Sequence, residues 1–377
     1  MRLERLVARG FRNLVDLDCA LPPEGVALLG PNGQGKTNFL EAVYYPVLFR
    51  SLRGASDAEL ARFGGPGFQV EAQVVETDAE GERTGERAVA VTYLSGNRKK
   101  RILVDGDEID RLVDVAGRWL AVAFLPSDVG LASGPAAERR QYLDRMLSLA
   151  DRRYLQALAR YRAALAQRNS ALRQGRPELA RPFDAPLAQA GARLVAARLE
   201  WARGAAEQFA AEFEALGERH AAALRYAGRA ELADPAAWGP ALDAAHATDR
   251  ARGMTTVGPH RDDVALLVGG RSVRDFGSTG QQRSAAIALK LIEIATLEHA
   301  RATEPALLLD DVFAELDRER QRRLAGRLLD RHGGRQVFLT APRRDELPEN
   351  LALPVWGVAD GAVSPRGEPG AAMRPSA

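Results

Sequence analysis

A glycine-rich loop at residues 30–37 constrains this sequence more than any other feature. It follows a short apolar run at residues 25–29 and precedes residues 37–45, whose apolar positions have helical spacing until Pro46 interrupts them. Glycine, four residues and then Gly-Lys-Thr is the pattern of a loop whose backbone amides point at phosphate oxygens. A glycine turn that caps a helix beside an exposed lysine is the simpler interpretation, and the pattern alone does not exclude it. Strand, loop and helix in this order favour an α/β fold with a nucleotide site.

Residues 30–38 supply the first candidate nucleotide ligands. Lys36 is expected to bring positive charge to the β- and γ-phosphates, and the hydroxyl of Thr37 to coordinate Mg²⁺. Only four of the 52 lysine and arginine residues are lysines, so a lysine here indicates that a compact charge is needed. The candidate residues in this segment are Gly30, Pro31, Asn32, Gly33, Gln34, Gly35, Lys36, Thr37 and Asn38.

Length, charge and cysteine content limit the class of protein. A chain of 377 residues exceeds one compact core, so a large domain with an inserted lobe, or two domains, is expected. The formal net charge of +2 argues neither for nor against nucleic acid. The single cysteine, Cys19, excludes an internal disulfide and suits a reducing compartment. Because there is no signal-like start and no long apolar run, we expect a cytoplasmic protein that does not span a membrane.

Periodicity predicts the order of the secondary-structure elements. Strand-like patterns occur at residues 2–7, 15–21, 25–29, 264–268, 306–309 and 336–340, and several alternating runs with turn signals between them occur within 68–104. Helical spacing occurs at residues 37–45, 138–173, 185–224, 281–300 and 318–331. Strands that alternate with helices near the C-terminus predict an α/β core, and the long alanine-rich and arginine-rich stretches predict a helical lobe. The segment after Gly361, rich in Gly, Pro and Arg, is expected to be a disordered tail.

Two aspartates follow the apolar run at residues 306–309. Asp310 is expected to hold Mg²⁺, and Asp311 to orient or deprotonate a water that attacks the γ-phosphate. An ordinary turn at a strand end is the alternative for this pair taken alone. Together with the phosphate loop, the pair becomes a specific indication of nucleotide hydrolysis.

A polar turn with Ser278, Thr279, Gly280 and Gln281 opens the helix predicted at residues 281–300. A serine at a helix start, free amides and the positive end of the helix dipole form an anion site, although a simple N-cap explains the same residues. The order of phosphate loop, polar turn, acidic strand end and acidic loop (residues 314–317) resembles the ABC ATPase superfamily. In that superfamily the polar turn is the signature that contacts the γ-phosphate of ATP held by another nucleotide-binding domain. Because this chain has one copy of each element, the resemblance implies an ATP-dependent homodimer.

The sequence departs from the usual ABC pattern at four positions. Thr279 replaces the first glycine of the signature, Ala314 replaces the serine of the acidic loop, and Asp311 stands where most members have glutamate. Thr340 lies in the region where transporters carry a switch histidine. We therefore expect slow hydrolysis, with Asp311 and Lys36 as the catalytic residues.

Further segments resemble the RecF family over about residues 1–360. They are Gly-Phe-Arg-Asn-Leu at 10–14, Phe-Arg-Ser-Leu-Arg at 49–53, Glu-Arg-Arg-Gln-Tyr-Leu-Asp at 138–144, Gln-Arg-Asn at 167–169 and Thr-Thr-Val-Gly-Pro-His-Arg-Asp-Asp at 255–263. The resemblance implies an ABC-type head with a mixed sheet core and an antiparallel subdomain, split into residues 1–134 and 254–364. An inserted helical lobe at 135–253 and a tail at 365–377 complete this expected division. When the family resemblance is left aside, His260 in the last segment fits two interpretations, a metal ligand or a structural residue.

The same resemblance implies a weak DNA-stimulated ATPase that acts as a switch. An ATP-bound dimer would close on gapped or junction DNA and, with RecO and RecR, promote RecA loading in recombinational repair, replication recovery and the SOS response. Candidate DNA contacts, chosen for local positive charge, are Arg98, Lys99, Lys100, Arg101, Arg139 and Arg140. For each of them a solvated basic surface is the alternative.

Two other functions fit the motifs less well. A transporter ATPase subunit needs far less chain between Lys36 and Ser278 and usually has the switch histidine. A chromosome-organising ATPase of the SMC kind inserts very long heptad coiled coils, whereas residues 135–250 hold only a short helical insertion.

Overall fold

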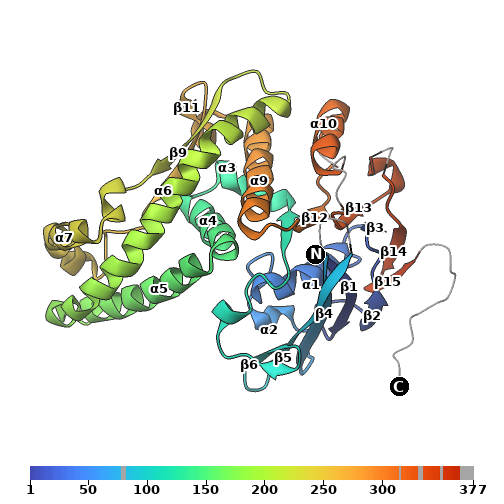
Figure 1. Cartoon of the computed structure of the whole chain (residues 1–377), viewed down its shortest axis with the longest axis horizontal. Helices are drawn as coiled ribbons and strands as arrows, with labels where there is room; N and C mark the ends of the chain where they lie inside the picture. Colours follow the sequence, from blue (N-terminus) through green and yellow to red (C-terminus); the bar gives the residue numbers. More distant parts are fainter. Residues whose placement is uncertain (78–81, 314–315, 330–333, 349–350, 366–377) are drawn as a thin grey trace. The chain divides into compact units, whose positions relative to one another are not determined.

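The computed structural model describes residues 1–77, 82–313, 316–329, 334–348 and 351–365. The chain divides into two compact units, which are Met1–Ser127 with Leu297–Ala377, and Asp128–Thr296 (Figure 1). This division differs from the expected one, because residues 254–296 belong to the second unit and not to the unit that contains the phosphate loop.

The first unit contains a six-stranded sheet in the order β15-β14-β3-β13-β12-β8. Its strands are β3 (Gly25–Leu29), β8 (Ala121–Phe124), β12 (Ala306–Asp310), β13 (Val337–Ala341), β14 (Val355–Ala359) and β15 (Ala362–Pro365). All neighbours pair in parallel except the β14–β15 hairpin. Every residue of β3, β8, β12 and β13 is buried, as parallel strands covered on both faces require. The predicted strands at 25–29, 306–309 and 336–340 are thus confirmed.

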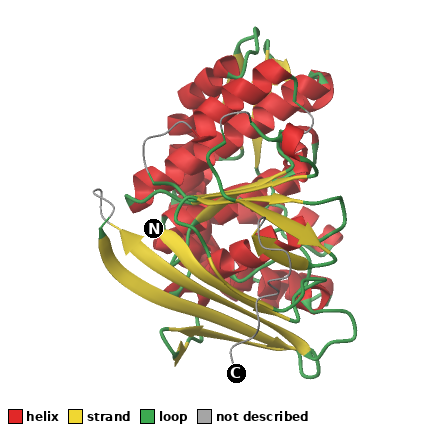
Figure 2. Cartoon of the chain, turned by 90° about the vertical axis from the view of Figure 1, so that its right-hand side faces the viewer, coloured by secondary structure: helices red, strands yellow, loops and turns green. Residues whose placement is uncertain are grey.

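A second, antiparallel sheet in this unit has the order β2-β1-β4-β5-β6-β7. Its long curved strands are seen in Figure 2. They are β1 (Arg2–Arg9), β2 (Leu17–Ala20), β4 (Gly67–Thr77), β5 (Arg83–Leu94), β6 (Lys99–Val104) and β7 (Asp107–Glu108). The paired N-terminal strands and the small sheet predicted within 68–104 are both confirmed, and the two form one sheet.

Helix α1 (Lys36–Leu48) contacts strands of both sheets and carries the phosphate loop at its N-terminus. It continues through Pro46, which corrects the prediction that this proline interrupts it. Pro46 has no N–H to donate to the Ala42 carbonyl, and this loss affects only the end of the helix, because Phe49, with φ 55°, ends it three residues later by donating its backbone N–H to the Tyr45 carbonyl. Two shorter helices, α2 (Asp57–Leu60) and α10 (Arg318–Leu329), also lie in this unit.

The second unit is mainly helical and has a three-stranded sheet of its own. Its helices are α3 (Gly130–Ser133), α4 (Ala136–Ala150), α5 (Arg152–Arg173), α6 (Asp184–Ala215), α7 (Trp238–Arg252), α8 (Val273–Phe276) and most of α9 (Thr279–Arg301). The sheet has the order β11-β10-β9, with β9 (Ala222–Ala227), β10 (Asp263–Val268) and β11 (Arg271–Ser272). The helical lobe predicted from residues 138–224 is confirmed in its main part.

Three predictions about these segments are wrong. The strand at 264–268 is not part of the α/β core, because β10 pairs antiparallel with β9 along its whole length. The helix predicted to reach residue 224 ends at Ala215, where Gly217 takes a left-handed φ of 96° and the chain turns into β9. Residues 362–365 are not part of a tail, because they form β15 after a turn at Asp360 and Gly361. Residues 366–377 lie outside the described residues.

Short 3₁₀ turns connect these elements, at Leu112–Asp114, Pro126–Val129, Pro177–Leu179, Arg181–Phe183, Ala230–Ala233, Pro235–Ala237 and Arg344–Glu346. Among the described residues, no helix is both apolar enough and long enough to span a lipid bilayer.

Candidate nucleotide-binding site

The glycine-rich loop connects β3 to α1 and folds around the side chain of Lys36. Lys36 is only 4% exposed, and its Nζ donates to the carbonyls of Gly30 (2.7 Å) and Pro31 (3.1 Å). Gly33 and Gly35 have φ values of 82° and 114°, so both need the freedom of glycine. A Cβ on Gly30 would lie 2.1 Å from the Val358 carbonyl oxygen, so this position has no room for a side chain. The loop therefore folds against the Lys36 ammonium and keeps a positive charge next to its own backbone, as a phosphate site requires.

Two other segments hold the loop in place. Asn13 donates to the Gly33 carbonyl (3.4 Å) and accepts from Asn38 (2.7 Å). At the turn between β14 and β15, the backbone N–H of Asp360 donates to the Gln34 side-chain oxygen (2.6 Å), and the N–H of Gly361 donates to the Gln34 carbonyl (2.9 Å). Asn38 and Gln34, predicted as nucleotide ligands, are thus also braces of the loop.

The strand end at Asp310 lies directly against Thr37. The Thr37 hydroxyl is 2.9 Å and 3.0 Å from the two carboxylate oxygens of Asp310, and the Thr340 hydroxyl is 2.8 Å from one of them. Burial raises the pKa of Asp310, which is 5% exposed, while the bonds from Thr340 and Thr37 oppose that shift and the charge of Asp311 adds to it. Two residues that are far apart in the sequence and were predicted to share one magnesium site are thus brought together.

Asp311 has an unusual backbone conformation. Its φ of 48° is left-handed, which is uncommon for an aspartate, and its backbone N–H donates to the Thr340 hydroxyl oxygen (3.0 Å). The same hydroxyl lies 3.2 Å from the Asp311 carboxylate. Thr340 therefore links both aspartates, a role that the sequence did not indicate because only the parallel pairing of β12 with β13 places it beside Asp310.

The donor set at this strand end fits Mg²⁺. A threonine hydroxyl and one carboxylate are oxygen ligands, and Mg²⁺ in nucleotide sites uses one or two carboxylates with phosphate and water. Among the described residues there is no group of three or more His, Cys, Asp or Glu side chains arranged to hold a metal. The set thus suits a metal that arrives with a nucleotide.

The predicted signature turn lies in the second unit, between α8 and α9. The backbone N–H of Ser278 donates to the Gln281 side chain (3.0 Å), and the N–H of Gln281 donates to the Ser278 hydroxyl (3.2 Å). This reciprocal pair is a capping box, so the N-cap interpretation is confirmed for Ser278. Ser278 and Thr279 are exposed, and Gly280 is half-buried, which leaves the first turn of α9 open to a ligand. Beside it Phe276 is 68% exposed, with the Arg271 guanidinium over its ring.

The acidic loop is described only in part. Ala314 and Glu315 lie outside the described residues. The carboxylate of Asp317 accepts from the backbone N–H groups of Glu319 (3.1 Å) and Arg320 (2.9 Å), so it caps α10.

A buried carboxylate on α1 was not predicted. Glu41 is fully buried and accepts from Ser51 (2.5 Å), Arg53 (2.6 Å) and Arg12 (3.0 Å). Burial alone would raise the pKa of Glu41, but the bonds from Arg53, Ser51 and Arg12 hold it below the ordinary value. The segments 10–14 and 49–53, noticed only as family-like sequences, therefore meet at the helix that follows the phosphate loop.

A cavity of about 960 Å³ opens beside this part of the loop. Asn13 and Asn38, which brace the loop, form part of its lining together with Arg12. Phe63, also in the lining, presents a ring that is completely exposed. The cavity thus combines an aromatic face, amides, two arginines and one carboxylate, that of Glu59, next to the phosphate loop.

The six predicted DNA contacts differ in burial and in ion pairing. Arg139 is buried, pairs with Asp263 (2.7 Å) and donates to two backbone carbonyls, which corrects its selection as a phosphate contact. Arg140 is half-buried and donates to the Asp262 carbonyl (2.8 Å). Burial, the largest influence on Arg140, lowers its pKa.

Of the four basic residues from Arg98 to Arg101, at the start of β6, two are paired with carboxylates and two are not. Lys100 pairs with Asp57 (2.8 Å), and Arg101 pairs with Glu108 (2.6 Å). Arg98 and Lys99 are exposed, and within the described residues their side chains make no ion pair. Of the six candidates, these two are the most available to a phosphate backbone.

The loop that contains His260 is a structural element of the second unit. Nδ1 of His260 is 2.6 Å from the Tyr161 hydroxyl, and Nε2 is 2.9 Å from the Thr255 carbonyl. Burial lowers the pKa of His260. Because both ring nitrogens have partners, the structural interpretation is favoured over the metal site.

Comparisons with known proteins agree on one family. The family model described as the RecF/RecN/SMC N-terminal domain matches residues 2–354. The DNA replication and repair protein RecF of Anaeromyxobacter sp. (strain K) is 38% identical, over 97% of this chain and 99% of the relative. The protein of the same description from Myxococcus xanthus (strain DK1622) is 36% identical over 90% of each chain.

Solved structures agree with the sequence relatives. A structure of the recombination mediator protein RecF with ATP is 28% identical to this chain, covers 96% of it and 97% of its own length, and has a TM-score of 0.87. An Smc head bound to the C-terminal winged-helix domain of ScpA is 14% identical with a TM-score of 0.55, which shows a shared fold and nothing more.

Proposed function

The chain belongs to the RecF family of DNA replication and repair proteins and has the ABC/SMC-like ATPase head fold, and we propose that it is an ATP-switched clamp on DNA. The observation that carries the proposal is the contact of Thr37 with Asp310 beneath the loop that encloses Lys36. P-loop ATPases use this combination of lysine, hydroxyl and carboxylate to hold a phosphate group accompanied by Mg²⁺.

The first unit supplies the primary nucleotide pocket. The backbone of residues 30–37 and the ammonium of Lys36 would hold the β- and γ-phosphates, since the ammonium already lies against the Gly30 and Pro31 carbonyls of the loop. Thr37 and Asp310 would hold Mg²⁺, which neutralises phosphate charge when bound. The cavity with Phe63 and Asn38 would take the adenosine, because an exposed aromatic face stacks well on a base.

Hydrolysis would depend on the pair of aspartates and Thr340. Asp311, held in its left-handed conformation by the Thr340 hydroxyl, would orient the attacking water and accept its proton. Aspartate has a shorter reach than glutamate, so a slow reaction is expected. Slow turnover suits a switch that stays closed until hydrolysis resets it.

Dimerisation would complete the site. Ser278, Thr279, Gly280 and Gln281 would contact the γ-phosphate held by a second copy, through the exposed first turn of α9. ATP would thereby join two copies head to tail around two nucleotides. The closed dimer would grip gapped or junction DNA in the cytoplasm and, with RecO and RecR, promote RecA loading. Arg98 and Lys99 are the candidate contacts to the DNA backbone.

Four variants test the separate roles. Lys36→Met should abolish ATP binding, whereas Lys99→Met, which removes an exposed lysine, should leave it unchanged. Asp311→Asn should bind ATP and accumulate as the dimer, because hydrolysis no longer resets it. Ser278→Arg should bind ATP as a monomer and fail to dimerise.

Sizing with ATP and Mg²⁺, with and without gapped DNA, is the measurement. The proposal fails if the wild-type chain neither dimerises nor gains DNA affinity with ATP. Loss of ATP binding by the Ser278→Arg monomer would place Ser278 in the primary pocket and overturn its role across the dimer.

A further inference from the structure

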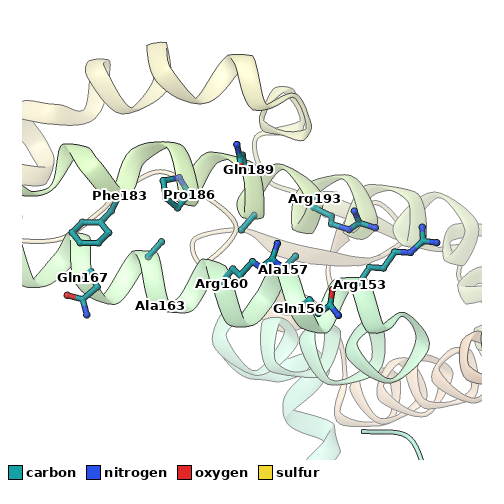
Figure 3. A pocket seen from close by; sticks show the side chains of 12 residues that line it. Arg153, Gln156, Ala157, Arg160, Ala163, Gln167, Phe183, Pro186, Gln189 and Arg193 are labelled. Carbon is teal, nitrogen blue, oxygen red and sulfur yellow. The ribbon is translucent and has the colours of Figure 1, made fainter. Parts of the chain in front are cut away.

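A groove of about 530 Å³ runs between α5 and α6 in the second unit, and none of its residues belongs to the nucleotide site (Figure 3). On α5 the lining includes Arg153, Gln156, Arg160, Ala163 and Gln167, which repeat at intervals of three and four residues. Residues with this repeat form one continuous stripe along a helix. The same repeat forms the contact seam of a coiled coil, so the stripe has the geometry of a helix-packing surface.

The floor of the groove is formed by small apolar side chains. Ala157, Ala164 and Ala190 are each 6% exposed and lie where α5 and α6 approach each other. Phe183 and Pro186 add apolar surface at one end, as Figure 3 shows. Small residues at a seam let another backbone approach closely, and they offer no hydrogen bond to a polar ligand.

The rim of the groove is positively charged. The guanidinium groups of Arg153, Arg160 and Arg193 line it, and no aspartate or glutamate does. Within the described residues these three side chains make no ion pair or hydrogen bond. By contrast, Arg162 on the same helix pairs with Asp144 (2.9 Å). A partner with negative charges would therefore find three cations that are not already neutralised.

The shape and floor of the groove favour a helix over nucleic acid. Packed helices have axes about 8–10 Å apart, so a third helix, about 10–12 Å wide, fits over the groove and touches both walls. The DNA backbone would use the arginines but would gain nothing from the alanine floor or from Phe183. An amphipathic helix uses both features.

We propose that this groove docks an acidic amphipathic helix of a partner protein. Small apolar side chains of the partner would pack on the alanine floor, and its Asp or Glu residues would face Arg153, Arg160 and Arg193. From Arg153 to Gln167 the stripe is about 21 Å long at 1.5 Å per residue, which sets the docked helix at about fourteen residues. This surface and the ATP site are independent, so failure of one proposal leaves the other standing.

The test uses the full chain and two synthetic 21-residue peptides labelled with fluorescein. One presents alanine and leucine on one face flanked by glutamate, and the other has lysine in place of every glutamate. Fluorescence anisotropy measures their affinities, and a labelled 20-base-pair duplex is the third probe. The groove variant is Arg153→Glu with Arg160→Glu and Arg193→Glu. Its matched control, Arg219→Glu with Arg225→Glu and Arg250→Glu, has the same charge change at exposed positions of the same unit outside the groove.

We expect the wild-type chain to bind the acidic peptide and not the basic one. The groove variant should lose at least tenfold in affinity for the acidic peptide and gain affinity for the basic peptide, whereas the control should change less than twofold. Ala163→Trp should weaken acidic-peptide binding at least fivefold by filling the groove, and Ala159→Trp, on an exposed position of α5 outside it, should not. An unchanged far-ultraviolet circular dichroism spectrum and an unchanged urea midpoint verify that the helical unit of each variant is folded.

Three results would overturn the proposal. The first is equal loss of the acidic peptide in the groove variant and its control, which would mean non-specific attraction. The second is normal binding by Ala163→Trp, which would exclude docking in the groove. The third is loss of duplex affinity in the groove variant without any binding of the acidic peptide, which would assign the surface to DNA.

Discussion

Replacing Glu41 by glutamine should loosen the helix that carries the phosphate loop. Glu41 is fully buried and accepts bonds from Arg12, Ser51 and Arg53. Glutamine has nearly the same shape, but it offers one neutral oxygen where two arginines and a hydroxyl now share a carboxylate. Its amide group, a donor, would face guanidinium groups that cannot accept.

The loss of stability in Glu41→Gln depends on how deeply its two arginine partners are buried. Breaking a fully buried ion pair costs about 3–5 kcal/mol. Arg12 and Arg53 keep 21% and 37% of their side-chain surface exposed, so both reach water when they lose the carboxylate, and the cost must be discounted. We expect a loss of about 2 kcal/mol in local stability, which corresponds to about 30-fold faster amide exchange where opening is local.

Hydrogen–deuterium exchange of the amides of α1 is the direct assay. Glu108→Gln is the matched control, because it removes the same charge from an arginine ion pair that is exposed to solvent. The control should leave α1 exchange unchanged. Because the pKa of Glu41 is held below its ordinary value of 4.5, its stabilising contribution is present above that value and is lost as pH falls through the lower folded pKa. The difference between wild type and Glu41→Gln should therefore be full at pH 7 and shrink below pH 4.5. Equal exchange in both variants, or a difference that grows in acid, would refute this reasoning.

Three further predictions concern the catalytic strand ends, the helical unit and the dimer. Thr340→Val removes the hydroxyl that bonds Asp310 and should reduce ATP turnover at least tenfold while ATP affinity stays within threefold; unchanged turnover would show that this hydroxyl does not position the catalytic carboxylates. Arg139→Met leaves the partly exposed Asp263 without its partner and should cost about 2–3 kcal/mol in urea unfolding of the helical unit, so a neutral result would mean that Arg139 is free for another role. Phe276→Ala should weaken ATP-dependent dimerisation about tenfold in analytical ultracentrifugation, since exposed aromatic rings are frequent interface anchors, and an equal loss of monomer ATP affinity would contradict its place at the dimer surface.

The phosphate loop and the acidic strand end were predictable because their signals are local. Strand, glycine loop and helix occupy one continuous segment, so Lys36 and Thr37 could be placed without knowing the rest of the fold. Asp310 could be assigned only in combination with the phosphate loop, because an acidic strand end taken alone also fits an ordinary turn. Thr340 was noticed only as a departure from a pattern, because its bonds depend on which strand pairs with β12.

The assignment of β10 and of Arg139 failed for a related reason. An apolar run of five residues reads the same in a parallel core and in a small antiparallel sheet, and only pairing with β9 decides between them. Arg139 resembled a surface cation because its partner, Asp263, lies 124 residues away in sequence. Long-range pairing of this kind leaves no trace in local periodicity.

Buried arginines give the RecF-like segments a structural role that their sequences did not reveal. Arg168 donates to Asp184, Asp249 and Thr255, and Arg198 donates to the Pro259 carbonyl. A guanidinium has five donors in a fixed fork, so one residue can satisfy several buried acceptors from separate segments. Such a position tolerates neither lysine nor an apolar residue, because each would leave buried acceptors unpaired. Arg139 and Arg168 within the RecF-like segments are therefore internal supports, and DNA or partner contacts must be sought among exposed cations, such as Lys99 and Arg160.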